Sequence, residues 1–74
     1  MGRAITTAAD MGALLVGSIV SISGDGVMVN TALKTEPDNW ALAGQVRRYS
    51  ARLLFRSAIE RDGRNMNVLY EATE

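Results

Sequence analysis

The chain has 74 residues, eight basic and eight acidic, and contains neither cysteine nor histidine. Its length predicts one small domain over residues 1–74, which buries only about 60% of the surface of its unfolded chain. Without cysteine or histidine it forms no disulfide and lacks the usual general base and zinc ligand. We therefore expect a globular domain without a metal or cofactor, one that gains stability by associating with itself.

The first predicted element is a short helix from about Thr7 to Leu15. Thr6 or Thr7 can cap it, and Asp10 follows Thr7 by three residues, as in a capping box. Arg3 precedes an apolar run that crudely imitates a secretory signal, but Asp10 interrupts its approach. The run is also shorter than the about 20 residues that span a bilayer. We expect no membrane contact and a cytoplasmic location, or a virion if the protein comes from a phage.

The stretch "LLVGSIVSISGDGVMVNTAL", residues 14–33, can be interpreted as a buried helix, a membrane segment or two strands. Gly17, Gly24 and Gly26 each disfavour a helix by about 1 kcal/mol relative to alanine. The many isoleucines and valines favour strands, because branching at Cβ restricts them in helices. We predict a β-hairpin that turns at Gly24-Asp25, with glycine first as in a type II′ turn.

The hydrophobic pattern also predicts the register of this hairpin. A turn at Gly24-Asp25 pairs Ile22 with Val27 and Val20 with Val29. These four aliphatic side chains then share one face, and a slip of one residue would scramble the pattern.

The segment "KTEPDNWALAGQVRRYSARLLFRSAIERDG" predicts a long C-terminal helix of about six turns. Pro37 suits the first turn, Asp38 or Asn39 can cap it, and Gly63 follows the last periodic residue. On a helical wheel the apolar arc comprises Trp40, Leu42, Val46, Leu53, Leu54 and Phe55. The expected fold class is therefore α+β, with a short N-terminal helix, a hairpin and this long helix.

Pairs of small residues recur every seven positions along the predicted long helix, so that another helix can approach its low side closely. Either the first helix packs there within the monomer, or the same helix of a second subunit does. The residues predicted for an oligomer interface are Ala43, Gly44, Ser50, Ala51, Ser57 and Ala58, together with Trp40.

Arginines form a row on the same predicted helix. Arg48, Arg52 and Arg56 are spaced i, i+4, i+8, with Gln45 beside them, and no acidic residue lies between Gln45 and Ser57. Guanidinium groups in line can bind an acidic protein surface, a phosphate-bearing ligand or a nucleic-acid backbone. The alternative is a solvated helix face. Arg47 points close to the apolar arc, where we expect it to snorkel or to pair with an acidic group.

The tail after the long helix alternates, with Met66, Val68 and Tyr70 on one side. This pattern predicts a short C-terminal edge strand that joins the hairpin or reaches a neighbouring subunit. Glu71 and Glu74 can then face the arginine row of another copy.

Two resemblances follow from these motifs. The order helix, hairpin, helix, with "LLVGSIVSISGDGVMVNT", resembles the small phage head–tail joining proteins of the gpW type over residues 7–60. This resemblance implies a ring-forming virion component without catalytic activity. "DNWALAGQVRRYSARLLFRSAI" is similar to the long helix of phage proteins that sequester cyclic oligonucleotide immune signals. That second resemblance implies phosphate contacts by Arg48, Arg52 and Arg56.

The sequence offers no constellation typical of an enzyme. Its carboxylates are scattered, and "GDG" lacks the Lys-Ser/Thr continuation of a phosphate-binding loop. We therefore expect no catalytic residue. The leading hypothesis is a self-associating binding or assembly protein, such as a head–tail joining component of a virion. The alternatives are a phage-type sponge or inhibitor that uses the arginine row, and a small nucleic-acid-binding regulator.

Overall fold

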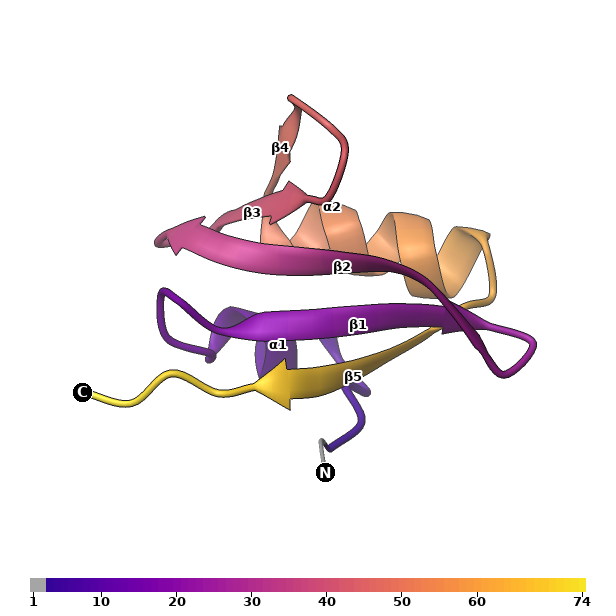
Figure 1. The fold of residues 1–74 in the computed structure, drawn as a ribbon, viewed down its shortest axis with the longest axis horizontal. Coiled ribbons are helices and arrows are strands. Elements are labelled where there is room, and N and C mark those ends of the chain that lie inside the picture. Colours follow the sequence, from indigo (N-terminus) through magenta and orange to yellow (C-terminus); the bar gives the residue numbers. More distant parts are fainter. Residues whose placement is uncertain (1–2) are drawn as a thin grey trace.

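A computed structural model describes residues 3–74 as a five-stranded antiparallel sheet with short helices against one face (Figure 1). The spatial order of the strands is β4-β3-β2-β1-β5. In chain order the elements are α1 (Ala8–Gly12), β1 (Ile19–Gly24), β2 (Val27–Glu36), β3 (Asn39–Leu42), β4 (Arg48–Tyr49), α2 (Ala51–Phe55), its π-helical continuation η1 (Arg56–Arg61) and β5 (Asn65–Tyr70).

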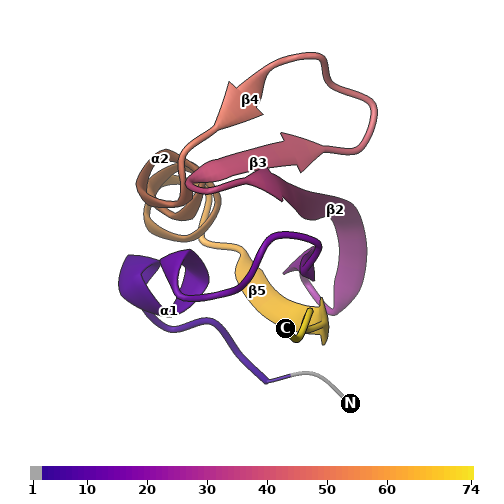
Figure 2. The same cartoon turned by 90° about the vertical axis from the view of Figure 1, so that its left-hand side faces the viewer.

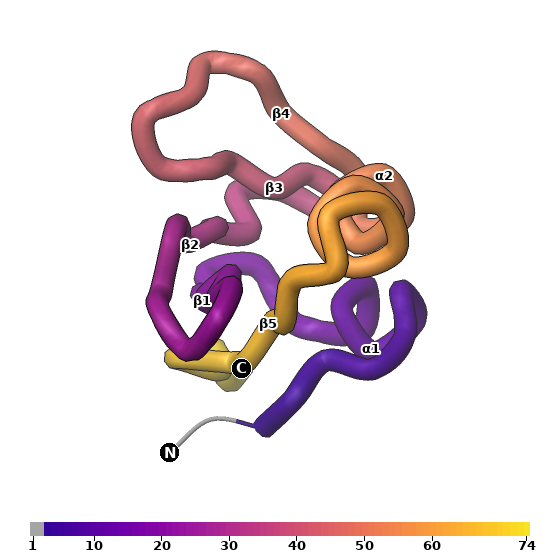
Figure 3. The backbone as a smooth tube through the Cα atoms, turned by 90° about the vertical axis from the view of Figure 1, so that its right-hand side faces the viewer, coloured from indigo at the N-terminus to yellow at the C-terminus, as the bar shows by residue number. Residues whose placement is uncertain are grey.

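The helices lie together on one side of the sheet. Strands β1 to β4 follow one another as a meander, and α2 with η1 then returns the chain from β4 to β5 at the opposite edge (Figure 1). Figures 2 and 3 show α1 beside α2, with the strands on their other side. The core lies between these two layers and comprises Ile5, Met11, Leu14, Val20, Ile22, Ala32, Trp40, Leu42, Ala51, Leu54, Phe55, Ala58, Met66 and Val68.

The predicted long C-terminal helix is wrong, because the chain turns back at Pro37-Asp38 instead of entering a helix there. Glu36 pairs with Asn39 across this turn, and Asp38 has a positive φ of 57°. A type II turn requires positive φ at its third residue and often has proline before it. The segment after the turn is therefore β3, which pairs with β2 and alternates half-buried with buried residues.

The chain also bends away at Gly44, whose φ of +81° no regular helix contains. Val46 is 96% exposed in the loop that follows, although the helical wheel places it on the apolar arc. The helix begins only at Ala51, where the Ser50 hydroxyl accepts a hydrogen bond from the Leu53 amide (3.1 Å). Its predicted end is confirmed, since Gly63 has a left-handed φ of +68° directly after the last turn.

A hairpin connects β1 and β2, but its turn lies one residue later than predicted. Asp25 (φ 52°) and Gly26 (φ 78°) are the central residues, and two positive φ values are what a type I′ turn requires. A register shift after Ile22 displaces the strands further. Val27 and Val29 are consequently 63% and 46% exposed, whereas the prediction places both with the buried aliphatic residues.

Helix α1 is shorter than predicted, although its start at the Thr7 cap is confirmed. The Thr7 hydroxyl accepts a hydrogen bond from the Asp10 amide (3.0 Å). At the other end, the buried Lys34 ammonium donates to the carbonyls of Gly12 (3.0 Å) and Leu14 (2.6 Å). A lysine from β2 therefore satisfies carbonyls that a longer helix would have bonded internally.

The C-terminal tail forms the predicted strand, β5, which pairs with β1. Met66 and Val68 are buried, but a register shift between Ile19 and Val20 leaves Tyr70 57% exposed. The other side of β5 pairs with the N-terminal segment at an Ala4–Asn67 bridge.

Candidate anion-binding groove

Charge is distributed very unevenly along this neutral chain. Residues 45–64 contain six of the eight basic residues and two of the eight acidic ones, which gives a formal charge of +4. The remainder of the chain therefore carries −4. The positive part comprises β4, α2 and η1 with their flanking loops, all on one side of the molecule (Figure 1).

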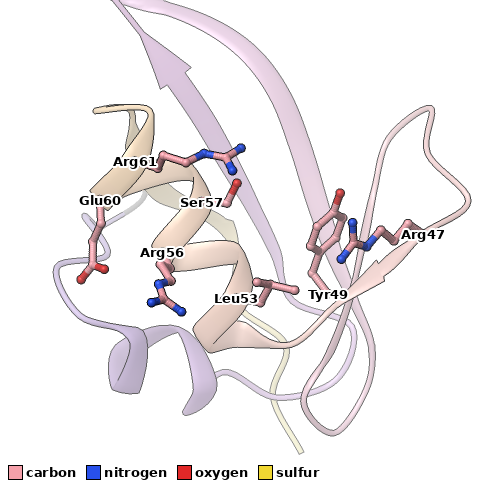
Figure 4. A pocket seen from close by; sticks show the side chains of 7 residues that line it. All are labelled: Arg47, Tyr49, Leu53, Arg56, Ser57, Glu60 and Arg61. Atoms are coloured by element: carbon pink, nitrogen blue, oxygen red, sulfur yellow. The ribbon is translucent and has the colours of Figure 1, made fainter.

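A groove of about 540 Å³ opens to solvent within this positive region. Arg47 and Tyr49, from the end of the β3–β4 loop and from β4, form one wall. The helix forms the other wall (Figure 4), with Leu53, Arg56, Ser57, Glu60 and Arg61.

The π-helical hydrogen bonding of η1 brings two arginines to the same groove. In an α-helix, residues five apart point about 140° away from each other. In η1 the Asp62 amide donates to the Ser57 carbonyl (3.1 Å), five residues back, so the helix is wider there. Arg56 and Arg61, also five apart, consequently both line the groove.

Tyr49 holds the opposite wall in place. Its hydroxyl donates a hydrogen bond to the Gln45 side-chain carbonyl (3.0 Å), and the Arg47 guanidinium lies 5.1 Å from the centre of its ring (Figure 4). This distance is typical of a cation–π contact. The groove therefore contains a planar aromatic group backed by the core and covered by a guanidinium.

Few of these arginines are neutralised by the protein itself. In the described part of the chain, ion pairs join Arg3 to Glu71 (3.2 Å) and Arg61 to Asp62 (3.6 Å). Arg47 and Arg56 are exposed and take part in neither pair. Glu60 is the one carboxylate in the groove lining, and no ion pair joins it to Arg56 within residues 3–74.

The structure divides the arginine row that the sequence predicts. Arg52 and Arg56 remain on one helix, and Gln45 supports Tyr49, but Arg48 lies in β4 and donates to the Val46 carbonyl (2.9 Å). Sequence reasoning missed Arg47 and Arg61 as members of the same groove. The position of Arg47 on the helical wheel was one available signal. A charged residue close to the apolar arc indicates that the segment is not helical there.

The small residues predicted for an oligomer interface do not share one helix face, because residues 39–50 form strands and a loop instead of the predicted helix. Ala43 and Gly44 lie in the β3–β4 loop, Ser50 caps α2, and Ser57 lines the groove. The other three, Trp40, Ala51 and Ala58, are buried in the core. A Cβ built on Gly12 lies 3.9 Å from that of Ala51, so α1 packs at this position within the monomer.

A second surface lies on the outer face of the sheet. One cross-strand row runs over all five strands, with Tyr70, Ile19, Leu33, Ala41 and Arg48 as successive partners. Tyr70 and Leu33 are 57% and 41% exposed. The row is therefore apolar from Tyr70 to Ala41 and ends in a charged residue only at Arg48.

Comparison with known protein families, curated proteins and solved structures found no match for this chain. Within residues 3–74, no three acidic, cysteine or histidine residues are grouped so as to hold a metal ion. No helix in this range is both long and apolar enough to cross a bilayer. The resemblance to gpW-type proteins stays a prediction.

Proposed function

We propose that this protein is a non-catalytic binding protein that holds a phosphate-bearing anion in the groove between β4 and the helix. The observation that carries the proposal is the convergence of Arg47, Arg56 and Arg61 on one open groove. Three guanidinium groups from two separate elements are placed there at the cost of mutual repulsion. A bound polyanion relieves that repulsion.

The chemistry of arginine favours phosphate as the ligand group. A guanidinium group presents its donors in a planar fork that matches two phosphate oxygens at once. Ser57 adds a hydroxyl on the helical wall of the groove (Figure 4). Glu60 opposes an anion at the groove margin and is expected to reduce the affinity.

Binding of inorganic polyphosphate, measured by isothermal titration calorimetry at low salt, tests this proposal. We expect Arg56→Ala and Arg61→Ala each to weaken binding about fivefold to tenfold, because each removes a charge-assisted contact. Arg3→Ala is the matched control, since Arg3 is also exposed and lies outside the groove. Absence of binding, or an equal loss in all three variants, contradicts the proposal.

Self-association through the outer row is a second candidate function, and it preserves the assembly role predicted from the sequence. The specific observation in its favour is that a two-fold rotation can place the row of one copy against the same row of a second copy. A two-fold axis through its middle lays the Arg48 end of one copy on the Tyr70 end of the other. The apolar residues between the ends then cover one another.

Sedimentation velocity over a range of protein concentrations tests the second candidate. We expect a reversible dimer, because apolar residues of the row are exposed in the monomer. A monomer at every concentration contradicts it. This result leaves the anion-binding proposal intact, because the groove lies on the helix side of the molecule.

A further inference from the structure

The arginine groove is the middle one of three adjoining hollows. It shares Arg56 and Glu60 with a hollow of about 430 Å³ that extends to Thr6, Thr7 and Ala8 before and within α1. On its other side it shares Tyr49, Ser57 and Arg61 with a hollow of about 230 Å³. Together they form a continuous path around α2 and η1, which we name the arginine track; its arginines are Arg47, Arg52, Arg56, Arg61 and Arg64.

The shape of the arginine track suits a chain rather than a compact small molecule. Small-molecule sites enclose most of the surface of their ligand with apolar walls. All three hollows are open to solvent, and polar and charged residues outnumber apolar ones in each lining. A flexible polymer with regularly spaced negative charges can follow such a path and contact successive arginines.

The aromatic contact in the groove distinguishes a nucleic acid from other polyanions. Proteins that bind single strands combine a positive groove with aromatic rings or guanidinium planes on which bases stack. Tyr49 is half-buried and carries the Arg47 guanidinium over its ring at 5.1 Å. A base can stack on that guanidinium or replace it over the ring, whereas polyphosphate or an acidic peptide gains nothing from the ring.

We propose that the arginine track binds single-stranded nucleic acid, with phosphates on the arginines and a base stacked at Arg47 and Tyr49. This inference rests on the proposed function and specifies its ligand. A duplex keeps its bases stacked inside the helix and leaves Tyr49 without a partner. The track therefore prefers a single strand to a duplex of the same sequence.

The experiment compares four labelled polyanions by fluorescence anisotropy: a 12-nucleotide single strand (oligo-dT or oligo-U), a duplex of the same length, inorganic polyphosphate and polyglutamate. We expect a single strand to bind at least about tenfold more tightly than the other three. Tyr49→Leu is expected to weaken single-strand binding about tenfold. The same variant leaves polyphosphate affinity within about twofold, and Tyr49→Phe, which keeps the ring, retains most of the single-strand affinity.

Two further variants keep the test decisive if Tyr49→Leu fails to fold. Arg47→Lys keeps the charge but loses the guanidinium plane, and we expect it to weaken single-strand binding severalfold without affecting polyphosphate. Arg52→Ala is expected to lower the slope of log affinity against log salt by about 0.7, as for one lost phosphate contact.

Three results overturn the inference. They are equal affinity for the single strand and polyphosphate, tighter binding of the duplex or polyglutamate, and indifference of single-strand binding to Tyr49→Leu and Arg47→Lys. The first and third leave the anion-binding proposal standing, because the arginines still bind phosphate. If the unsubstituted protein does not bind polyphosphate at all, both the single-strand inference and the anion-binding proposal are overturned.

Discussion

The helix side of the molecule and the outer face of its sheet are exposed surfaces of opposite character. On the helix side, arginines from the β3–β4 loop and from η1 converge on a hollow that contains one half-buried tyrosine. On the outer face, an apolar row crosses the curved sheet and reaches a charged residue at Arg48 in β4 (Figure 2). A concentrated positive charge beside a ring suits a polyanion, whereas an exposed apolar row suits another apolar surface. We therefore expect the two surfaces to act independently. Substitutions in the groove should leave self-association unchanged, and substitutions in the outer row should leave polyanion binding unchanged.

The largest expected effect comes from reversing charge in the groove. The double variant Arg56→Glu/Arg61→Glu should lose at least about 100-fold in affinity for polyphosphate and for a 12-nucleotide single strand, since attraction becomes repulsion at two contacts. Anisotropy titration measures this loss, while sedimentation velocity should show unchanged self-association. A change in self-association would mean that the two surfaces are not independent.

A smaller effect is expected from a charge in the middle of the outer row. Leu33→Asp should weaken self-association at least about tenfold, because it buries an unpaired carboxylate against the second copy. Leu69→Asp is the matched control: Leu69 is 54% exposed but lies outside the row, at the register shift of β5. An equal effect of both substitutions would contradict the role of the row. Polyanion affinity should stay within about twofold in either variant.

Removing the carboxylate from the groove should strengthen anion binding. Glu60→Gln keeps the size of the side chain and deletes one negative charge from the lining, so we expect affinity for polyphosphate to rise about twofold to fivefold. Glu74→Gln removes a charge from the C-terminal tail and serves as the control. Unchanged affinity in Glu60→Gln would place the bound anion elsewhere on the helix side.

The smallest expected effect concerns α1, at the end of the arginine track. Hydrogen bonds from the Thr6 side chain and amide lower the pKa of the Asp10 carboxyl below its usual value of 3.8. The carboxylate therefore stabilises the folded state above about pH 4, and this contribution is lost as the pH falls through the lowered pKa. Asp10→Asn should lower the Tm slightly at pH 7 and leave it unchanged at about pH 2. If Asp10→Asn still lowered the Tm at about pH 2, the ionised Asp10 carboxylate would not be the source of the stabilisation.

Signals confined to a few neighbouring residues allowed correct prediction of several local features. The Thr7 cap and the Gly63 stop both depend on the conformation of one or two residues, and both are confirmed. The Asp25-Gly26 turn lies one residue from its predicted place, because the glycines at 24 and 26 offer two alternative turns. The periodicity over residues 39–62 was misjudged. Trp40 and Leu42 share one side of a strand, whereas residues two apart lie about 200° apart on a helix, so their spacing favoured the strand that is observed.

The candidate site was only partly predictable for the same reason. Arg52 and Arg56 are neighbours on any helix, so their proximity follows from local spacing. Arg47 lines the same groove as Arg61 only because the chain folds back at Pro37-Asp38 and places β4 beside the helix. The π-helical turn that aligns Arg56 with Arg61 is also invisible in a pattern of apolar residues. Long-range pairing and a local widening of the helix thus determined most of the groove.

The way in which this sheet ends restricts how copies can meet. The strand β4 is only two residues long, and β5 receives an amide hydrogen bond from Ile5 at the Met66 carbonyl and donates one from Val68 to Arg3, each of 2.8 Å. Unpaired edges are where foreign strands add and where fibrils begin to grow. Within residues 3–74, one edge strand of the sheet is thus very short, and the other edge strand already pairs with the N-terminal segment. We expect concentrated solutions of this protein to form discrete particles rather than fibres.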